Sequence, residues 1–188
     1  MRTSLFVAAA LAGGLFALPA TAQFGGSVNR KAPKVEQSIT FGDAALKLTY
    51  RSFSWAEGRF MDALMADDER GAASRERVNK RAEGNPMGGL ETTAAFQMGG
   101  KTVPAGKYNL FFQIDEDRKW HLVAAGNGSD ARVDWALPSK DSPLPSPRLV
   151  CALRAGVADG TGVLNIAFGS TVCRIELSPG SGDQSGTR

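Results

Sequence analysis

The sequence contains few residues of the kinds that bind metals or act as catalytic bases. Its 188 residues include one histidine and two cysteines, which lie far apart along the chain. A zinc site needs three or four Cys, His or carboxylate ligands, and a hydrolytic triad needs a base beside its nucleophile. No serine stands in the Gly-x-Ser-x-Gly pattern of a nucleophile elbow. The sequence therefore predicts no metal centre, no cofactor and no triad, and we expect His121 to lie in a strand and face solvent.

Long apolar runs are also scarce, and the one that is present lies near the N-terminus. Residues 5–18 are apolar and uncharged, follow Arg2 and precede the small residues Ala20-Thr21-Ala22. This pattern is typical of a secretory signal peptide over residues 1–22 that is cleaved before Gln23; an uncleaved anchor is the alternative. The run is shorter than the ~20 residues of a membrane-spanning helix. We expect a periplasmic or secreted protein with no integral membrane segment after signal cleavage.

A concentrated basic surface is the third feature that the sequence lacks. Lys and Arg number 22 against 19 Asp and Glu, which gives a formal net charge of +3. The local basic excess over residues 70–81 is interrupted by an acidic residue at helical spacing, which is typical of an exposed helix. Because nucleic-acid binding needs a clustered basic face, we expect no nucleic-acid partner. The expected partner is an unidentified small ligand or an envelope protein.

The sequence does contain a strong period of two. Apolar and polar residues alternate along segments that are separated by turn pairs such as Gly42-Asp43, Gly99-Gly100 and Gly169-Ser170. Helices do not alternate with these segments, which argues against a parallel α/β fold. We predict an all-β protein, an antiparallel β-sandwich or open barrel of about nine short strands. The predicted strands are residues 35–41, 46–50, 94–98, 108–114, 120–124, 133–135, 148–154, 161–168 and 171–177.

One insert breaks this period. Residues 54–57 have the Ser-x-x-Glu form of a helix capping box, and apolar residues then recur at helical spacing. We predict a helix over residues 55–70 that is capped by Gly71, and a weaker helix over 73–82. The predicted organisation is a flexible leader over 23–34, one β-sandwich domain over 35–177 with the helical insert at about 55–82, and a disordered tail over 178–188.

The two cysteines, Cys151 and Cys173, leave a disulfide open. Export compartments are oxidising and favour pairing. In a simple meander, however, the two residues would flank Ile166 on either side, about 9.5 Å apart, which is twice the strand spacing. A disulfide allows Cα atoms no more than ~7 Å apart. Either the thiols are reduced and buried, or the strands do not form a simple meander.

Three residues are candidate ligand contacts: Trp55, Trp135 and Arg132. Trp55 begins the helical insert, and Trp135 lies in a loop-rich region beside charged residues. Aromatic rings at such places can stack on a ligand, whereas a Trp in a β-protein is more often part of the core. The sequence leaves both interpretations open.

A family resemblance rests on residues 99–112, Gly-Gly-Lys-Thr-Val-Pro-Ala-Gly-Lys-Tyr-Asn-Leu-Phe-Phe. Here Pro104 fixes the chain before a turn, Gly106 permits a positive φ, and Tyr108 opens a strand. Together with the hairpin before it and the strands after it, this segment resembles the bacterial exported family called domain of unknown function 2911 (DUF2911), over most of residues 33–178. Residues 79–85 differ from the Trp-Arg-Thr-Gly-Ala-Asn-like segment of that family. The resemblance implies an exported β-protein and no particular chemistry.

These features favour a non-enzymatic protein of the bacterial envelope that binds a small ligand or another protein. One alternative is a hydrolase that acts on envelope polysaccharide or peptide through two carboxylates, which needs no histidine. Another is a structural subunit of an envelope assembly. An exposed aromatic platform would favour the binding protein, and two carboxylates about 5–10 Å apart in a cleft would favour the hydrolase. An uncovered apolar patch or an open sheet edge would favour the structural subunit.

Overall fold

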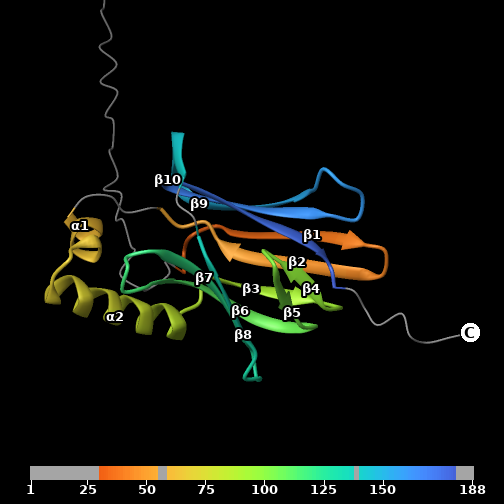
Figure 1. Cartoon of the computed structure of the whole chain (residues 1–188), viewed down its shortest axis with the longest axis horizontal. Helices are drawn as coiled ribbons and strands as arrows, with labels where there is room; N and C mark the ends of the chain where they lie inside the picture. Colours follow the sequence, from red (N-terminus) through yellow and green to blue (C-terminus); the bar gives the residue numbers. More distant parts are fainter. Residues whose placement is uncertain (1–29, 55–58, 138–139, 181–188) are drawn as a thin grey trace, which may run out of the picture.

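The chain folds into two antiparallel β-sheets that pack face to face, with two helices beside the larger sheet (Figure 1). This computed structural model describes residues 30–54, 59–137 and 140–180. The larger sheet has the strand order β1-β2-β3-β6-β7-β8, and the smaller has β5-β4-β10-β9. The predicted all-β sandwich with a short helical insert is confirmed. The strands are β1 (Lys34–Phe41), β2 (Ala44–Arg51), β3 (Gly88–Thr92), β4 (Phe96–Met98), β5 (Lys101–Val103), β6 (Gly106–Ile114), β7 (Trp120–Gly126), β8 (Arg132–Ala136), β9 (Lys140–Ala155) and β10 (Gly162–Pro179).

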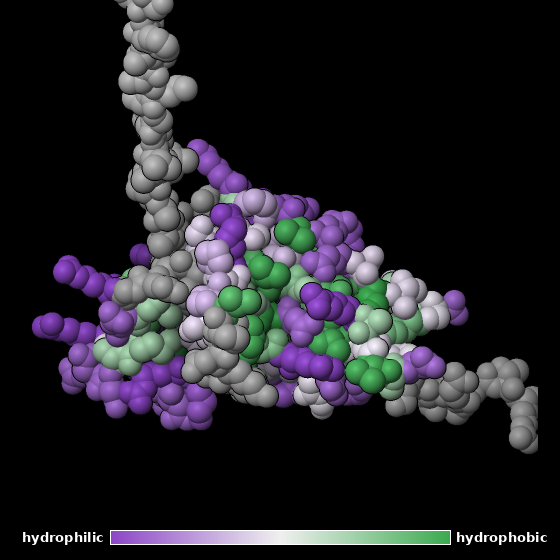
Figure 2. Space-filling model, turned by 90° about the horizontal axis from the view of Figure 1, so that it is seen from above, coloured by the Kyte–Doolittle hydropathy of each residue, from purple (hydrophilic) through white to green (hydrophobic). Residues whose placement is uncertain are grey.

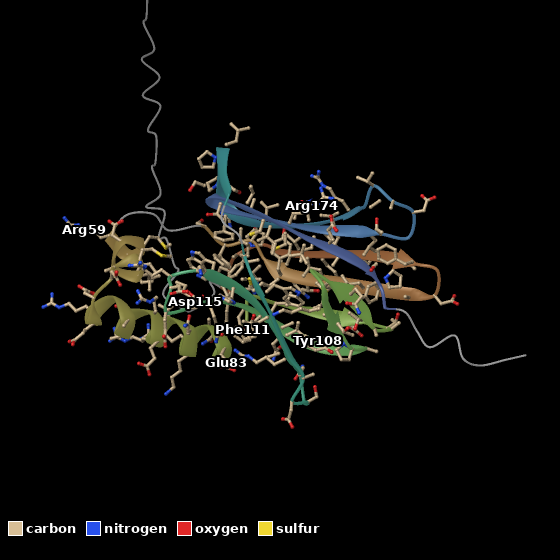
Figure 3. All side chains as sticks on the ribbon, viewed as in Figure 1. Arg59, Glu83, Tyr108, Phe111, Asp115 and Arg174 are labelled. Carbon is tan, nitrogen blue, oxygen red and sulfur yellow. The ribbon has the colours of Figure 1, made fainter. Side chains whose placement is uncertain are left out.

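The core lies between the two sheets and follows from the alternation along the strands. On β2, Leu46 and Leu48 are buried while Lys47 between them is exposed. Phe112 of the larger sheet and Phe168 of the smaller sheet bring their ring centroids to 5.3 Å, an ordinary separation for packed aromatic pairs. Side chains therefore fill the space between the two layers of ribbon (Figure 3).

The break between the two helices lies earlier in the chain than the sequence pattern predicts. α1 spans Arg59–Met65 and α2 spans Glu69–Gly84. Asp68 gives the physical reason, because its carboxylate accepts the N–H of Gly71 at 2.7 Å and caps the start of α2. The prediction that Gly71 ends a helix is therefore wrong; this residue lies in the first turn of α2. A Cβ at Gly71 would clash with the carbonyl group of Ala66, so the tight approach of the preceding chain requires glycine here.

The central strand β3 was not among the predicted strands. It pairs with β2 on one side and with β6 on the other, but it begins with Gly88 and Gly89, which carry no apolar side chain. A Cβ at Gly88 would clash with the carbonyl oxygen of Thr49 on β2. The close approach of β2 and β3 thus requires glycine at this position. Because glycine has no side chain, the apolar–polar alternation that would identify β3 is missing from the sequence.

The strands β9 and β10 are longer than predicted. The predicted strand 148–154 lies inside β9, and the predicted strands 161–168 and 171–177 both lie inside β10. The register between β9 and β10 shifts on both sides of Gly169, where φ is +52°, and the ribbon of β10 turns back near its label (Figure 1). The predicted turn at Gly169-Ser170 coincides with this register change. The two strands predicted on either side of that turn form the single strand β10 in the structure.

The predicted leader and tail both include residues that belong to the fold. Ala32 is buried, and its carbonyl oxygen accepts a hydrogen bond from Arg51 at 3.0 Å. At the other end Pro179 pairs with Phe96, and the N–H of Gly180 donates to Ala95 at 2.7 Å. The folded domain therefore extends beyond residues 35–177 at both ends. Among the described residues, no helix combines the length and the apolar character needed to cross a membrane.

Candidate binding site

Two of the three candidate ligand contacts lie on β8, and both serve the fold. Trp135 is 4% exposed, and its indole N–H donates to the carbonyl oxygen of Met98 at 2.6 Å. This places it in the core, the second of the two interpretations left open by the sequence. Trp55 lies outside the described residues.

Arg132 connects the sheet to α2. Its guanidinium lies over the ring of Phe111, 5.5 Å from the centroid, and donates to Glu83 at 3.1 Å and to Gln113 at 3.0 Å. Phe111 points away from the main core and is 1% exposed beneath the helix, as seen in Figure 3, where Phe111 and Glu83 lie on the α2 side. Because both terminal nitrogens of its guanidinium already donate hydrogen bonds, Arg132 is better placed to stabilise the helix on the sheet than to hold a ligand.

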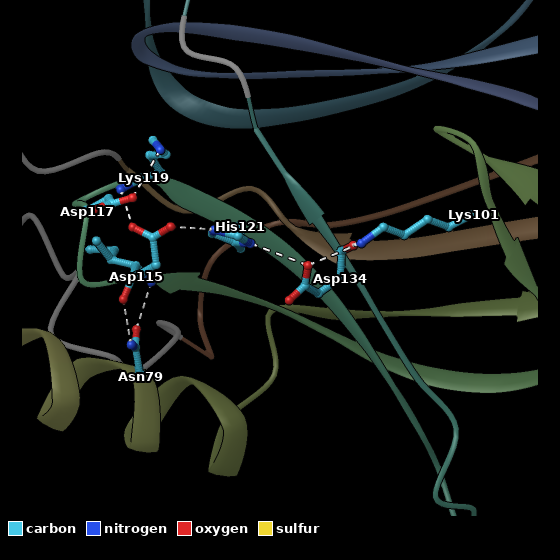
Figure 4. Close-up of polar contacts among 8 residues, drawn as sticks. Asn79, Lys101, Asp115, Asp117, Lys119, His121 and Asp134 are labelled. Carbon is cyan, nitrogen blue, oxygen red and sulfur yellow. Dashed lines mark hydrogen bonds and ion pairs between the residues drawn. The ribbon is translucent and has the colours of Figure 1, made fainter.

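His121 lies between two carboxylates on the outer side of the larger sheet (Figure 4). Its Nε2 is 2.9 Å from Asp115 Oδ2, and its Nδ1 is 3.4 Å from Asp134 Oδ1. Lys101 donates to the carbonyl oxygen of Asp134 at 2.5 Å and pairs with its carboxylate at 3.6 Å. Both imidazole nitrogens therefore face carboxylates, and neither is left to activate a nucleophile. The arrangement links the β6–β7 turn to β8.

Asp115 has a lowered pKa for identifiable reasons. Burial alone would raise the pKa of this carboxyl, but the hydrogen bonds from the Lys119 N–H and from His121, together with the charges of those residues, outweigh burial. The Lys119 N–H reaches Asp115 Oδ1 at 2.7 Å. Asp115 is thus held as a carboxylate by the turn that it closes.

A cavity of about 820 Å³ opens between α2 and the same turn. Asn79 forms its edge by hydrogen bonding to both the N–H and the carbonyl of Ile114, at 2.9 and 2.8 Å. The lining includes the acidic residues Glu76 and 115–117. Within the described part of the chain, no three His, Cys, Asp or Glu side chains form a group that could hold a metal ion.

The outer face of the smaller sheet carries a groove of different chemistry. Alternate residues of β9 and β10 point away from the core, and the register pairs them as Val150 with Ala167, Ala152 with Asn165, and Arg154 with Val163. These residues, apart from Val163, line a groove of about 360 Å³ together with Val172 and Arg174. Val150 is 41% exposed. Figure 2 views the molecule from above the β9–β10 side and shows hydrophobic surface interspersed with hydrophilic side chains. We call this site the outer-face groove.

The two arginines of the outer-face groove differ in their partners. Arg174 pairs with Glu176 at 3.7 Å, and both side chains are more than half exposed. Arg154 is exposed, and within residues 30–54, 59–137 and 140–180 its guanidinium has no hydrogen-bond or carboxylate partner. Arg174 also borders a second groove of about 380 Å³, whose lining includes Glu176. The outer-face groove therefore has a positive end beside an apolar floor.

The cysteines lie on the same strands and belong to the core, and Cys173 and Ile166 also border the outer-face groove. Cys151 is paired with Ile166, as the meander predicts, and both Cys151 and Cys173 are buried and free. Burial raises the pKa of the Cys151 thiol to about 12, with a smaller contribution from Cys173, and burial raises the pKa of Cys173 to about 11. Both side chains are therefore thiols at neutral pH and poor nucleophiles. The disulfide left open by the sequence is not formed in the structure.

The residues of the outer-face groove were missed in the sequence, although a signal for them is present. Leu149-Val150-Cys151-Ala152-Leu153 is an unbroken apolar run, whereas a strand with one solvated face shows alternation. Such a run indicates that both faces of the strand are apolar.

Comparison of the chain with protein-family models, with curated proteins and with solved structures found no match.

Proposed function

We propose that this protein is an exported, non-enzymatic binding protein of the bacterial envelope, and that it holds a small, largely apolar molecule in the outer-face groove. The observation that carries the proposal is the apolar outward row on β9 and β10, where Val150, Ala152, Ala167 and Val172 share one groove. The free energy falls when a ligand removes apolar side chains on the solvent side of a sheet from water. The positive end of the groove supplies the few polar contacts that orient a ligand.

The groove favours a small ligand over a large assembly surface. Its volume of about 360 Å³ lies at the low end of the range of roughly 300–1,000 Å³ for small-molecule sites. Exposed arginines border it on two strands. A structural subunit would bury a broad apolar surface with few charges at its centre, so the alternative of an assembly subunit has less support.

The hydrolase alternative also has less support. Asp115 and Asp134 are two carboxylates in one cluster, as that hypothesis requires, but the imidazole of His121 lies between them. A glycosidase keeps that space for the sugar and its attacking water. Membership of DUF2911 and the export route both remain proposals from the sequence.

The test uses the neutral dye Nile red, whose fluorescence rises in apolar surroundings. We expect the purified protein to bind the dye and Ala152→Trp, which fills the groove, to abolish the signal. The matched control Thr40→Trp places the same ring on an exposed position of β1, in the other sheet, and is expected to leave binding unchanged. Val150→Asp, at a position already 41% exposed, provides a second variant that tests the groove without filling it. Equal dye binding by all four proteins would exclude the groove as the site.

A further inference from the structure

We infer that the ligand of the outer-face groove is a single-chain carboxylate, a molecule with one negatively charged headgroup and one unbranched apolar chain. This inference rests on the proposed function and deepens it. It follows from the order of side chains along the groove, from the count of charges around it and from its size.

The groove changes character from one end to the other. The pair Val150 and Ala167 forms an apolar end, the pair Ala152 and Asn165 brings an amide, and the next outward residue on β9 is Arg154. Val172 and Arg174 repeat this order, apolar and then basic, on the later part of β10. A ligand that satisfies both ends has an apolar part and an anionic part, placed end to end.

The charge around the groove matches a single negative headgroup. Arg154 and Arg174 contribute two positive charges, and Glu176, which pairs with Arg174 at 3.7 Å, contributes one negative charge. Among the described side chains, one positive charge is left in excess, and it belongs to Arg154. A carboxylate would balance it, and guanidinium groups bind carboxylates through paired hydrogen bonds. A doubly charged phosphate would exceed the available positive charge.

The shape of the groove favours one chain. A cavity of about 360 Å³ is small among ligand sites, which suits a single hydrocarbon chain and excludes burial of a lipid with two chains. The groove lies on the face opposite α2, as Figure 3 shows for Arg174 against Glu83. Substitutions on α2 therefore serve as controls for substitutions in the groove.

The test compares dodecanoate with dodecanol, which share a chain and differ in headgroup charge. Isothermal titration calorimetry on the purified protein should show dodecanoate binding about tenfold more tightly than dodecanol. Arg154→Met keeps the apolar stem and removes the charge, so it should remove this preference and leave dodecanol binding unchanged. Arg77→Met makes the same exchange at an exposed position of α2 and should change neither affinity.

The outcomes separate the two proposals. If dodecanoate and dodecanol bind equally, and Arg154→Met changes neither, the groove binds apolar ligands but the charge inference is wrong. If neither binds, or if Ala152→Trp leaves binding of both unchanged, the outer-face groove is not the site and both proposals fail. Preference for dodecanoate that is lost in Arg154→Met and kept in Arg77→Met supports both.

Discussion

At the scale of single residues, the charged side chains divide into those that hold the fold together and those that are available to a ligand. Arg132 is surrounded by Phe111, Glu83 and Gln113, whereas Arg154 extends from β9 with no such partner among the described residues. The same residue type therefore has different roles, and the difference depends on neighbours that are distant in sequence. The sequence indicates Arg132 as a candidate ligand contact only from its position beside Trp135, because it does not show which charged side chains already have partners.

Arg132→Met should destabilise the protein by about 1 kcal/mol. The substitution removes a cation–π contact, worth about 0.5–1 kcal/mol at an exposed site, and an exposed ion pair with Glu83, worth at most about 1 kcal/mol. Chemical denaturation measures the change in the free energy of unfolding. Arg77→Met on the same helix is the control and should change that free energy by less than about 0.5 kcal/mol. A similar effect of both substitutions would show that Arg132 does not fasten α2 to the sheet.

Asp115 should contribute stability that depends on pH. Its pKa in the folded protein lies below the ordinary value of 3.8, so the folded state holds this proton less tightly than the unfolded state. Its contribution is then fully present above about pH 5 and is lost as the pH falls through the folded pKa. The difference in unfolding free energy between the wild type and Asp115→Asn should shrink below about pH 4. Asp159→Asn, in an exposed loop, is the control, and a pH-independent difference for Asp115→Asn would contradict the assigned contacts.

At the scale of elements, alternation predicted most of the strands but missed β3 and β5. β3 was missed because Gly88 and Gly89 remove its apolar pattern, and the helix break was misplaced because the cap at Asp68 was not recognised in the sequence. The outer-face groove could not be located from the sequence because its members come from β9 and from two parts of β10. Which side chains share a groove is decided by register, and the register depends on the shift at Gly169.

Gly71→Ala should destabilise the protein by about 1–3 kcal/mol. The added Cβ would meet the carbonyl group of Ala66, and such overpacking costs about that amount. Gly84→Ala, at the other end of α2, is a matched control because a Cβ there has nothing within 4 Å. This control should be neutral or stabilise by up to about 1 kcal/mol. Thermal unfolding of both variants measures the contrast, and equal effects would show that the chain before α2 does not approach the helix closely.

At the scale of the whole molecule, the two outer faces of the sandwich differ. The larger sheet is covered over β6 by α2, and the region near it carries polar contacts such as those of His121 and Asn79. The smaller sheet exposes an apolar groove with a positive end. Within the described part of the chain this groove is open to solvent, and exposed apolar surface of this kind is typical of an interaction site. The central claim is therefore that the uncovered face carries a ligand.

Native mass spectrometry of the protein purified from its own host tests this claim most directly. We predict a discrete mass in addition to the polypeptide, present in the wild type and in Thr40→Trp and absent from Ala152→Trp. Denaturing spectra of the same samples would show whether the chain begins at Gln23. An additional mass that persists in Ala152→Trp, or a wild-type protein that carries no ligand and takes up neither dodecanoate nor dodecanol, would contradict a binding role for the outer-face groove.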